Sequence, residues 1–190
     1  MARPRGFDED KAVDAAMRAF WSAGYEATST QDLCTATGLG RSSIYNTFTS
    51  KHDLFERALG RYMAVKNAAT EEVLDADAPA AEKLRTLLWR TVDAPDEDPI
   101  GCLVVNSTVE LGPRDTRVAA TLRTDQRYRL ELLTAVIESG QRAGDIRRNK
   151  DAHTLALFLI ATISGIQVAA RGGADREERA AIATTALEVL

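Results

Sequence analysis

Few residues in this 190-residue chain could bind a metal or act as a nucleophile, since it has only two cysteines and two histidines. Cys34 and Cys102 lie far apart in the sequence and match neither a metal-binding nor a redox spacing. His52 and His153 have no evident partner, and no GxSxG, HExxH, P-loop or dinucleotide-binding pattern is present. We therefore expect two reduced, packed thiols, no metal, no cofactor and no enzymatic activity.

Long hydrophobic segments are also scarce. The first eleven residues have no apolar core and soon become acidic, which does not fit a secretory signal. The longest apolar run covers residues 155–170, and Thr162, Ser164 and Gln167 interrupt it. At sixteen residues it is shorter than the roughly 20 residues that span a bilayer. We expect this run to form a buried helix in a cytoplasmic protein without a membrane partner.

The chain as a whole has no excess of positive charge, because its formal net charge is -4. An acidic protein is in general a poor candidate for nucleic-acid binding. The charge is unevenly distributed, however. Residues 1–66 carry nine Lys and Arg against eight Asp and Glu, whereas residues 67–190 carry fifteen against twenty. The charge of the N-terminal third is therefore compatible with a nucleic-acid partner.

Hydrophobic residues repeat with helical spacing along almost the whole chain. In the first such segment Val13, Ala16, Phe20 and Trp21 share one face, and Gly24 follows as a glycine just past the last turn. No segment shows the alternation of a strand, and there is no internal repeat. We predict an all-α fold of about nine helices, with a small N-terminal unit and a larger C-terminal helical bundle.

Within the N-terminal unit, two short helices are predicted on either side of a glycine turn. Ser29 with Asp32 three residues later is typical of a capping box that opens the first of them, and Gly38 ends it. Residues 41–47 form the second, whose side chains are mostly polar. This arrangement is that of a helix-turn-helix, in which the second helix enters the major groove of DNA. The alternative is a solvated polar helix between two core helices.

The polar residues of this segment fall into two groups by the DNA contact that they suit. Base edges are bound by short donors and acceptors on an exposed helix face. Residues that offer such groups are Arg41, Ser42, Ser43, Asn46 and Thr47. Phosphates are bound by cations, hydroxyls and backbone N–H groups at helix starts. Residues placed for this role are Thr30, Tyr45 and Lys51, and Arg3 and Arg5 near the N-terminus suit phosphates or an A·T-rich minor groove.

The stretch AFWSAGYEATSTQDLCTATGLGRSSIYNTFTSKHDLF, residues 19–55, resembles the TetR/AcrR family of bacterial transcriptional regulators. The matching positions are Gly24, Tyr25, Gly38, Leu39, Tyr45, Phe48, Lys51 and Leu54. The resemblance implies a homodimeric, ligand-responsive repressor that a small molecule releases from a pseudo-palindromic operator in double-stranded DNA. It implies a DNA-binding domain over residues 1–50 and a ligand-binding and dimerisation domain over residues 51–190, with residues 51–74 as the connecting helix.

The resemblance also implies which residues contact the operator. The matching positions are Thr30, Gly40, Ser42, Ser43, Tyr45, Asn46, Thr47 and Lys51. Tyr45 and Lys51 would bind phosphates. Asn46 and Thr47 stand where the family often has aromatic and His-type residues, so the base preference of relatives does not transfer to this chain. We expect Arg41, Ser43 and Asn46 to contact the bases.

In the resembled family, the C-terminal part contains a pocket for an inducer. Candidates for its wall are apolar residues and polar or aromatic residues on helix faces that should be buried. They are Tyr62, Trp89, Cys102, Asn106, Glu110, Tyr128, Phe158 and Thr162. Side chains of these kinds more often belong to an ordinary core or make a satisfied buried hydrogen bond, which is the alternative for each of them.

The family also has a two-helix dimer face, for which the two C-terminal helices are candidates. Small residues on the first of them permit close helix approach, and the second carries an apolar stripe. The candidate positions are Ala161, Gly165, Ala169, Ile182, Ala186 and Leu190. The alternative is that both helices complete the core of a monomer. We prefer the dimer because helix-turn-helix proteins commonly bind two half-sites.

A second functional class stays open on the sequence alone. The apolar segment 100–111 could bind another protein, which would make the chain a helical adaptor without sequence-specific DNA binding. That hypothesis does not need Tyr45, Lys51 or the polar helix at residues 41–47. Alanine substitutions at those positions would separate the two functions.

Overall fold

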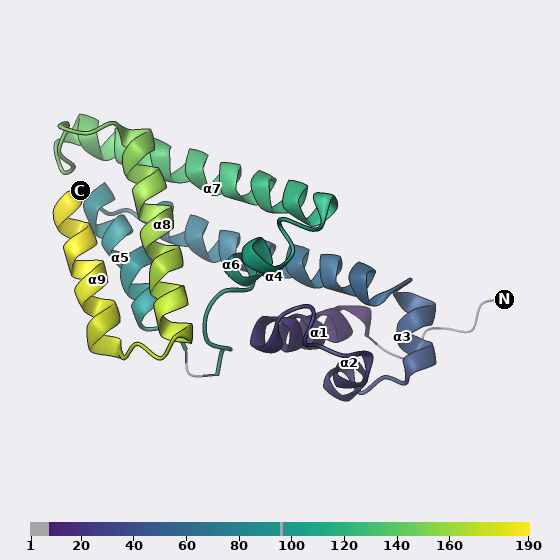
Figure 1. Ribbon diagram of the computed structural model, residues 1–190. Helices are drawn as coiled ribbons and strands as arrows, with labels where there is room; N and C mark the ends of the chain where they lie inside the picture. The colour runs from purple at the N-terminus through teal and green to yellow at the C-terminus, as the bar shows by residue number, and fades with distance from the viewer. Residues whose placement is uncertain (1–7, 96) are drawn as a thin grey trace.

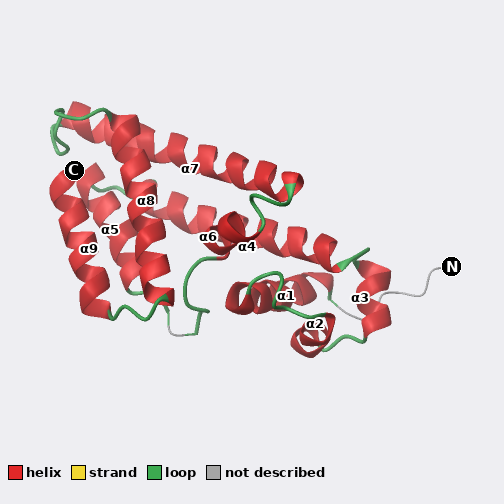
Figure 2. Cartoon of the chain, viewed as in Figure 1, coloured by secondary structure: helices red, strands yellow, loops and turns green. Residues whose placement is uncertain are grey.

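The computed structural model describes residues 8–95 and 97–190, and Figures 1 and 2 show helices joined by short loops. Nine helices and no strand occur in these residues, so the predicted fold class is confirmed. The predicted arm with Arg3 and Arg5 lies outside them. The helices are α1 (Glu9–Ala23), α2 (Thr30–Thr37), α3 (Arg41–Thr47), α4 (Lys51–Leu74), α5 (Ala80–Val92), α6 (Leu103–Glu110), α7 (Thr116–Ala143), α8 (Ala152–Arg171) and α9 (Arg176–Val189).

Helices α2 and α3 begin and end where their local sequence predicts. Ser29 and Asp32 form a reciprocal capping box: the Ser29 hydroxyl accepts from the Asp32 N–H at 3.1 Å, and the Asp32 carboxylate accepts from the Ser29 N–H at 2.8 Å. Gly38 ends α2 with a φ of 68°, in the left-handed region that favours glycine. After Gly40, α3 runs for seven residues, and Ile44 is its one buried residue.

The long helix α4 connects the two halves of the molecule. It has 24 residues and therefore a length of roughly 36 Å. The Ser50 hydroxyl caps it by accepting from the Asp53 N–H at 3.0 Å. This cap is not a reciprocal capping box, because the Asp53 carboxylate accepts from the Thr49 N–H and not from that of Ser50.

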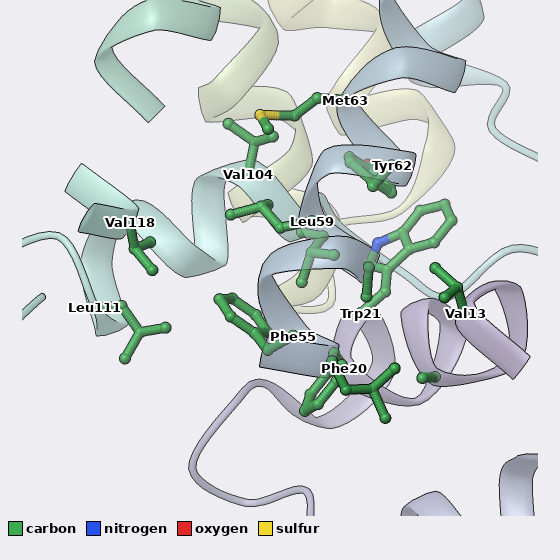
Figure 3. Packing of buried hydrophobic residues seen from close by; sticks show 14 of the residues in the cluster. Val13, Phe20, Trp21, Phe55, Leu59, Tyr62, Met63, Val104, Leu111 and Val118 are labelled. Carbon is green, nitrogen blue, oxygen red and sulfur yellow. The ribbon is translucent and has the colours of Figure 1, made fainter. Parts of the chain in front are cut away.

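Two hydrophobic clusters make up the core. The first packs α1, α2 and α3 against the first half of α4 and also includes α6 and the start of α7. Figure 3 shows its centre, where Phe20 of α1 meets Phe55 of α4 edge to face with ring centroids 5.2 Å apart. The second cluster joins the end of α4 to α5, α7, α8 and α9. Because the clusters change over between Met63 and Val73, α4 belongs to both cores. The domain division at residue 50 stays a prediction.

The apolar run in α8 is not a buried helix, contrary to our expectation. Leu157 and Val168 on its outer face are 42% and 56% exposed. At 20 residues α8 is long and apolar enough to cross a membrane, and 28% of its most apolar window is buried in the structure. Length and composition alone are weak evidence for a membrane span, since core helices meet the same test. What the structure does show is an apolar helix that its own chain covers on one side only.

Candidate nucleic-acid interface and cavity

Helix α3 lies at the end of the molecule away from α9 (Figure 1), and its polar side chains are exposed or half-buried. Ile44 and Phe48 are fully buried and fix the orientation of the helix. Of the predicted DNA contacts, the exposed ones are Gly40, Arg41, Ser42, Tyr45 and Asn46, and the half-buried ones are Thr30, Ser43, Thr47 and Lys51. Short donors and acceptors on α3 are therefore accessible to a partner as large as double-stranded DNA.

Two of the predicted phosphate contacts lie together. The hydroxyl of Thr30, the first residue of α2, is 3.1 Å from the phenol oxygen of Tyr45 in α3, and either oxygen can donate. The hydrogen bond links α2 to α3 at an exposed position. A pair of adjacent hydroxyls retains a donor for a phosphate oxygen.

Lys51 is held against an aromatic ring. Its Nζ lies 4.4 Å from the ring centroid of Tyr25, a cation–π contact, and the Tyr25 ring in turn meets Phe55 edge to face at 4.9 Å. Burial, and next the carboxylate of Glu26, raise the pKa of the Tyr25 phenol, so the ring stays neutral under the ammonium group. Tyr25 thus positions the lysine, which is a role that the sequence did not reveal.

Glu110 binds backbone groups and lies outside the lining of the cavity described below, which corrects our prediction. Its carboxylate accepts two backbone hydrogen bonds in the loop between α1 and α2, from the N–H of Tyr25 at 2.9 Å and of Glu26 at 2.8 Å. Gly24 makes room for this contact: its φ is 88°, and a Cβ there would lie 3.0 Å from Glu110 Oε2. The end of α6 is therefore attached to the loop that carries Tyr25, and through Tyr25 to Lys51.

A cavity of about 630 Å³ lies where the two clusters meet. Predicted residues Tyr62 and Cys102 are among its lining. Burial raises the pKa of Tyr62 well above its ordinary value, so its phenol is neutral. The larger apolar side chains of the lining include Trp21, Tyr62, Met63, Leu87, Cys102, Val104, Leu133, Ile160 and Ile163. The size and lining are those of a site for a small organic molecule.

Besides Glu110, several predicted pocket residues lie elsewhere. Trp89 packs beneath the Arg176 guanidinium, 5.8 Å from the ring centroid. Phe158 is exposed on α8, and the Thr162 hydroxyl donates to the Phe158 carbonyl of the same helix. Periodicity identified these faces as apolar but could not tell which of them another helix covers.

Tyr128 and Asn106 are likewise outside the lining of the large cavity. Tyr128 lines an adjoining, open groove between α4 and α7, which shares Met63, Asn67 and Asp125 with the lining of the cavity. The Tyr128 phenol donates to the Glu71 carboxylate. Asn106 is half-buried on α6, and its Nδ2 has no hydrogen-bond partner among the described residues. Neither residue joins Tyr62 and Cys102.

The polar centre of the cavity is a group of three residues that the sequence analysis missed. Asp125 is only 7% exposed, and its Oδ1 accepts from Asn67 Nδ2 at 2.9 Å. Arg129 Nε lies 3.0 Å from Asp125 Oδ2, close enough for an ion pair but without hydrogen-bond geometry. A signal was present, since Asp125 and Arg129 fall between Leu122 and Leu133 on the apolar stripe of α7.

The predicted dimer-face residues divide into three groups by their exposure in the single chain. Ala161 and Gly165 on α8 are exposed, and Ile182 on α9 is 40% exposed. Ala169 and Leu190 are half-buried. Ala186 is 2% exposed within the chain's own second cluster, so its assignment to the dimer face is wrong.

The thiols and one imidazole have structural surroundings. Cys34 and Cys102 are free thiols, half-buried and buried respectively. His52 at the start of α4 contacts Asp115 through Nε2 and lies 3.4 Å from Glu56 through Nδ1, which ties α4 to the start of α7. Within residues 8–95 and 97–190, no group of three or more His, Cys, Asp or Glu side chains could hold a metal ion.

This chain is similar to known proteins in both sequence and structure. Residues 12–58 match the model described as "Bacterial regulatory proteins, tetR family", and residues 80–186 match "Tetracyclin repressor-like, C-terminal domain". The chain is 34% identical over 190 residues to the HTH-type transcriptional repressor ComR of Escherichia coli (strain K12), covering 98% of this chain and 90% of the relative. A solved structure of the TetR family transcriptional regulator CifR, a cysteine mutant bound to 26-base-pair operator DNA, superposes with a TM-score of 0.87 at 33% identity and 98% coverage of both chains.

Proposed function

The chain belongs to the TetR family and is a DNA-binding transcriptional regulator, and we propose that it acts as a homodimeric repressor released by a small molecule. The main support is the open polar surface of α3, with Thr30, Tyr45 and Lys51 beside it. Family members are regulators and not enzymes, as the sequence indicated. The adaptor alternative is not favoured, because the relatives match along the whole chain and one of them is bound to operator DNA. A DNA partner also implies a cytoplasmic location.

The contacts divide as the chemistry of the residues suggests. Thr30, Tyr45 and Lys51 would bind phosphates, because they offer hydroxyls and a cation beside helix starts. Arg41, Ser43 and Asn46 would contact base edges. Of the remaining predicted contacts, Ser42 and Thr47 also offer short donors and acceptors to the major groove, and Gly40 would contact the operator at the start of α3.

The dimer would form through the outer faces of α8 and α9, which lie side by side in Figure 1. Leu157, Ala161, Gly165 and Val168 are all exposed and share one stripe of α8, and Ile182 extends the apolar surface on α9. Exposed apolar surface of this kind marks an interaction site. The small residues at its centre would let two copies of α8 approach closely.

The cavity could control DNA binding through two connections. Helix α4 reaches from the cavity residues Tyr62 and Met63 to Lys51. Helix α6 begins after the cavity residue Cys102 and ends at Glu110, which is bonded to the loop before α2. A ligand that binds one arrangement of these helices better than the other would shift the population away from DNA binding.

The first experiment is selection of preferred duplexes from a random pool at a fixed, stated salt concentration. We expect an enriched pseudo-palindrome with two half-sites about 34–36 Å apart. Lys51→Ala should weaken binding to all duplexes and reduce the salt slope by about 1, whereas Asn46→Ala should relax base preference at one position and cost about 1–3 kcal/mol.

Matched controls are Lys11→Ala, an exposed lysine of α1, and Thr35→Ala, an exposed hydroxyl of α2. Both should leave operator affinity unchanged. Recovery of no motif, or equal and sequence-independent losses from all four variants, would contradict the proposed role of α3.

A further inference from the structure

The charges around the cavity suggest what kind of molecule it binds. We infer that the ligand is an amphipathic organic anion, with one carboxylate held by Arg129 and an apolar body against the hydrophobic wall. This inference rests on the proposed function of the cavity as an effector site. It adds the chemical class of the effector.

The Arg129 guanidinium is a cation in the cavity wall that can bind an anion. The Asp125 carboxylate is already engaged by Asn67 Nδ2 at 2.9 Å and by Arg129 Nε at 3.0 Å. The terminal NH₂ groups of Arg129 donate no hydrogen bond within the described part of the chain. A guanidinium group binds a carboxylate through two parallel hydrogen bonds. Arg129 can therefore keep its pairing with Asp125 and still accept an anionic ligand.

The other acidic groups of the wall are also compensated. Asp98 lies 3.2 Å from Arg18 and 3.5 Å from Lys66, and Asp93 lies 2.7 Å from Arg176. The carboxylates of the wall are Asp93, Asp98 and Asp125, and its cations are Lys66, Arg90, Arg129 and Arg179. The wall therefore holds four cations against three carboxylates. Arg18 and Arg176 lie outside the lining and pair with Asp98 and Asp93, and the exposed Glu72 lies 3.9 Å from Arg90.

A cationic ligand fits this environment poorly. The aromatic face that could hold it is occupied, because Lys66 Nζ lies 4.9 Å from the Trp21 ring centroid and 5.6 Å from that of Tyr62. A wholly apolar ligand would cover the terminal NH₂ groups of Arg129 without offering them a hydrogen-bond acceptor. Met63, Leu133 and Ile160 supply an apolar wall, so one charged head group with a hydrocarbon body satisfies both parts of the cavity.

Three probes with the same ten-carbon chain and different head groups test the inference: decanoate, 1-decanol and decylamine. Their binding to the full-length protein is measured by isothermal titration calorimetry, below the concentrations at which they form micelles. Release from the selected operator is followed in parallel by fluorescence anisotropy. We expect decanoate to bind with a Kd at least about tenfold lower than either other probe, which is the size of one modest charged contact.

The double variant Asp125→Asn/Arg129→Gln removes both charges together, so it leaves no unpaired buried carboxylate. In this variant the Kd of decanoate should rise to within about threefold of that of decanol. Arg123→Gln, exposed on the same helix and outside the cavity, is the matched control and should keep the full preference. Retained operator binding verifies that both variants are folded.

Three results would overturn the assignment: equal or tighter binding of decanol or decylamine, a preference that survives in the double variant, or no binding of any probe. In each case the unliganded protein is titrated with its operator in the same experiment. Intact operator binding then means that only the ligand class is wrong. Absent operator binding would overturn the proposed function itself.

Discussion

Replacing Glu110 by alanine should destabilise the protein and weaken its binding to DNA. The Glu110 carboxylate joins the end of α6 to the loop between α1 and α2, through the backbone N–H groups of Tyr25 and Glu26. Tyr25 in turn carries Lys51 on its ring. Removal of one side chain on α6 should therefore be felt 59 residues earlier in the sequence, at a predicted phosphate contact.

The magnitude follows from the burial of the two donors. A hydrogen bond to a charged acceptor contributes about 1.5–3 kcal/mol, and a buried N–H left without a partner costs about 1–3 kcal/mol. The Tyr25 N–H is part-buried and would bear this cost, whereas the Glu26 N–H is exposed and would bond to water. We expect a loss of about 2 kcal/mol in the free energy of unfolding, or about 4–8 °C in Tm for a chain of this size.

Urea unfolding followed by circular dichroism gives the first readout, and operator titration at two salt concentrations gives the second. Glu138→Ala is the matched control, because Glu138 is an exposed glutamate whose ion pair with Arg142 is long at 3.8 Å. Such a pair contributes well under about 1 kcal/mol. If Glu110→Ala differed from wild type by no more than this control, the connection through Glu110 would not contribute to stability. Unchanged operator affinity would remove it from the control of DNA binding.

Three further predictions concern caps, turns and the outer helix face. A hydrogen bond from a backbone N–H of α8 holds the pKa of Asp151 below 3.8, so this carboxylate stabilises the fold above that pH and ceases to do so as the pH falls through the lower folded pKa. In urea unfolding, the stability lost between pH 7 and pH 3 should therefore be smaller for Asp151→Asn than for wild type. An equal loss would exclude this carboxylate as a source of the pH dependence. Gly38→Ala should lower the free energy of unfolding by about 1–2 kcal/mol, through backbone conformation alone because no atom lies within 4 Å of the new Cβ. Gly60→Ala inside α4 should instead raise the free energy of unfolding. Similar effects at both positions would refute the argument. Val168→Asp should convert the dimer to a monomer in analytical ultracentrifugation. Val65→Asp introduces the same charge at an exposed position of α4 and should leave the dimer intact. A monomeric wild type would refute the dimer.

The sequence predicted those parts of the fold that depend on interactions between residues a few positions apart. Ser29 and Asp32 cap α2 because their side chains reach backbone groups three positions away. Gly38 ends the same helix because the left-handed backbone there favours a residue without a Cβ. In the described chain, Asp115, Asp151 and Asp175 cap the starts of α7, α8 and α9 in the same local way.

Contacts between distant segments could not be predicted in the same way. Glu110 looks in the sequence like a polar residue on an apolar helix, and its true partner is a pair of backbone groups more than eighty residues earlier. Asp125 and Arg129 left a visible gap in the apolar stripe of α7, yet only the three-dimensional arrangement shows that this gap opens onto a cavity. The six predicted pocket residues that lie elsewhere had the right chemistry but faced other neighbours.

Helix α8 shows most clearly what hydrophobicity in a sequence does and does not report. A run of apolar residues records that a surface is to be removed from water, and it says nothing about which molecule covers it. Inside this chain the covering stops halfway round the helix, since Leu155 and Ile166 are buried while Leu157 and Val168 are exposed. Both halves have the same apolar character, so a partner outside the chain should complete the burial. The expectation of a buried helix was therefore wrong for the single chain, because the outer face of α8 is apolar but uncovered. For that reason we expect the dimer to bury this face.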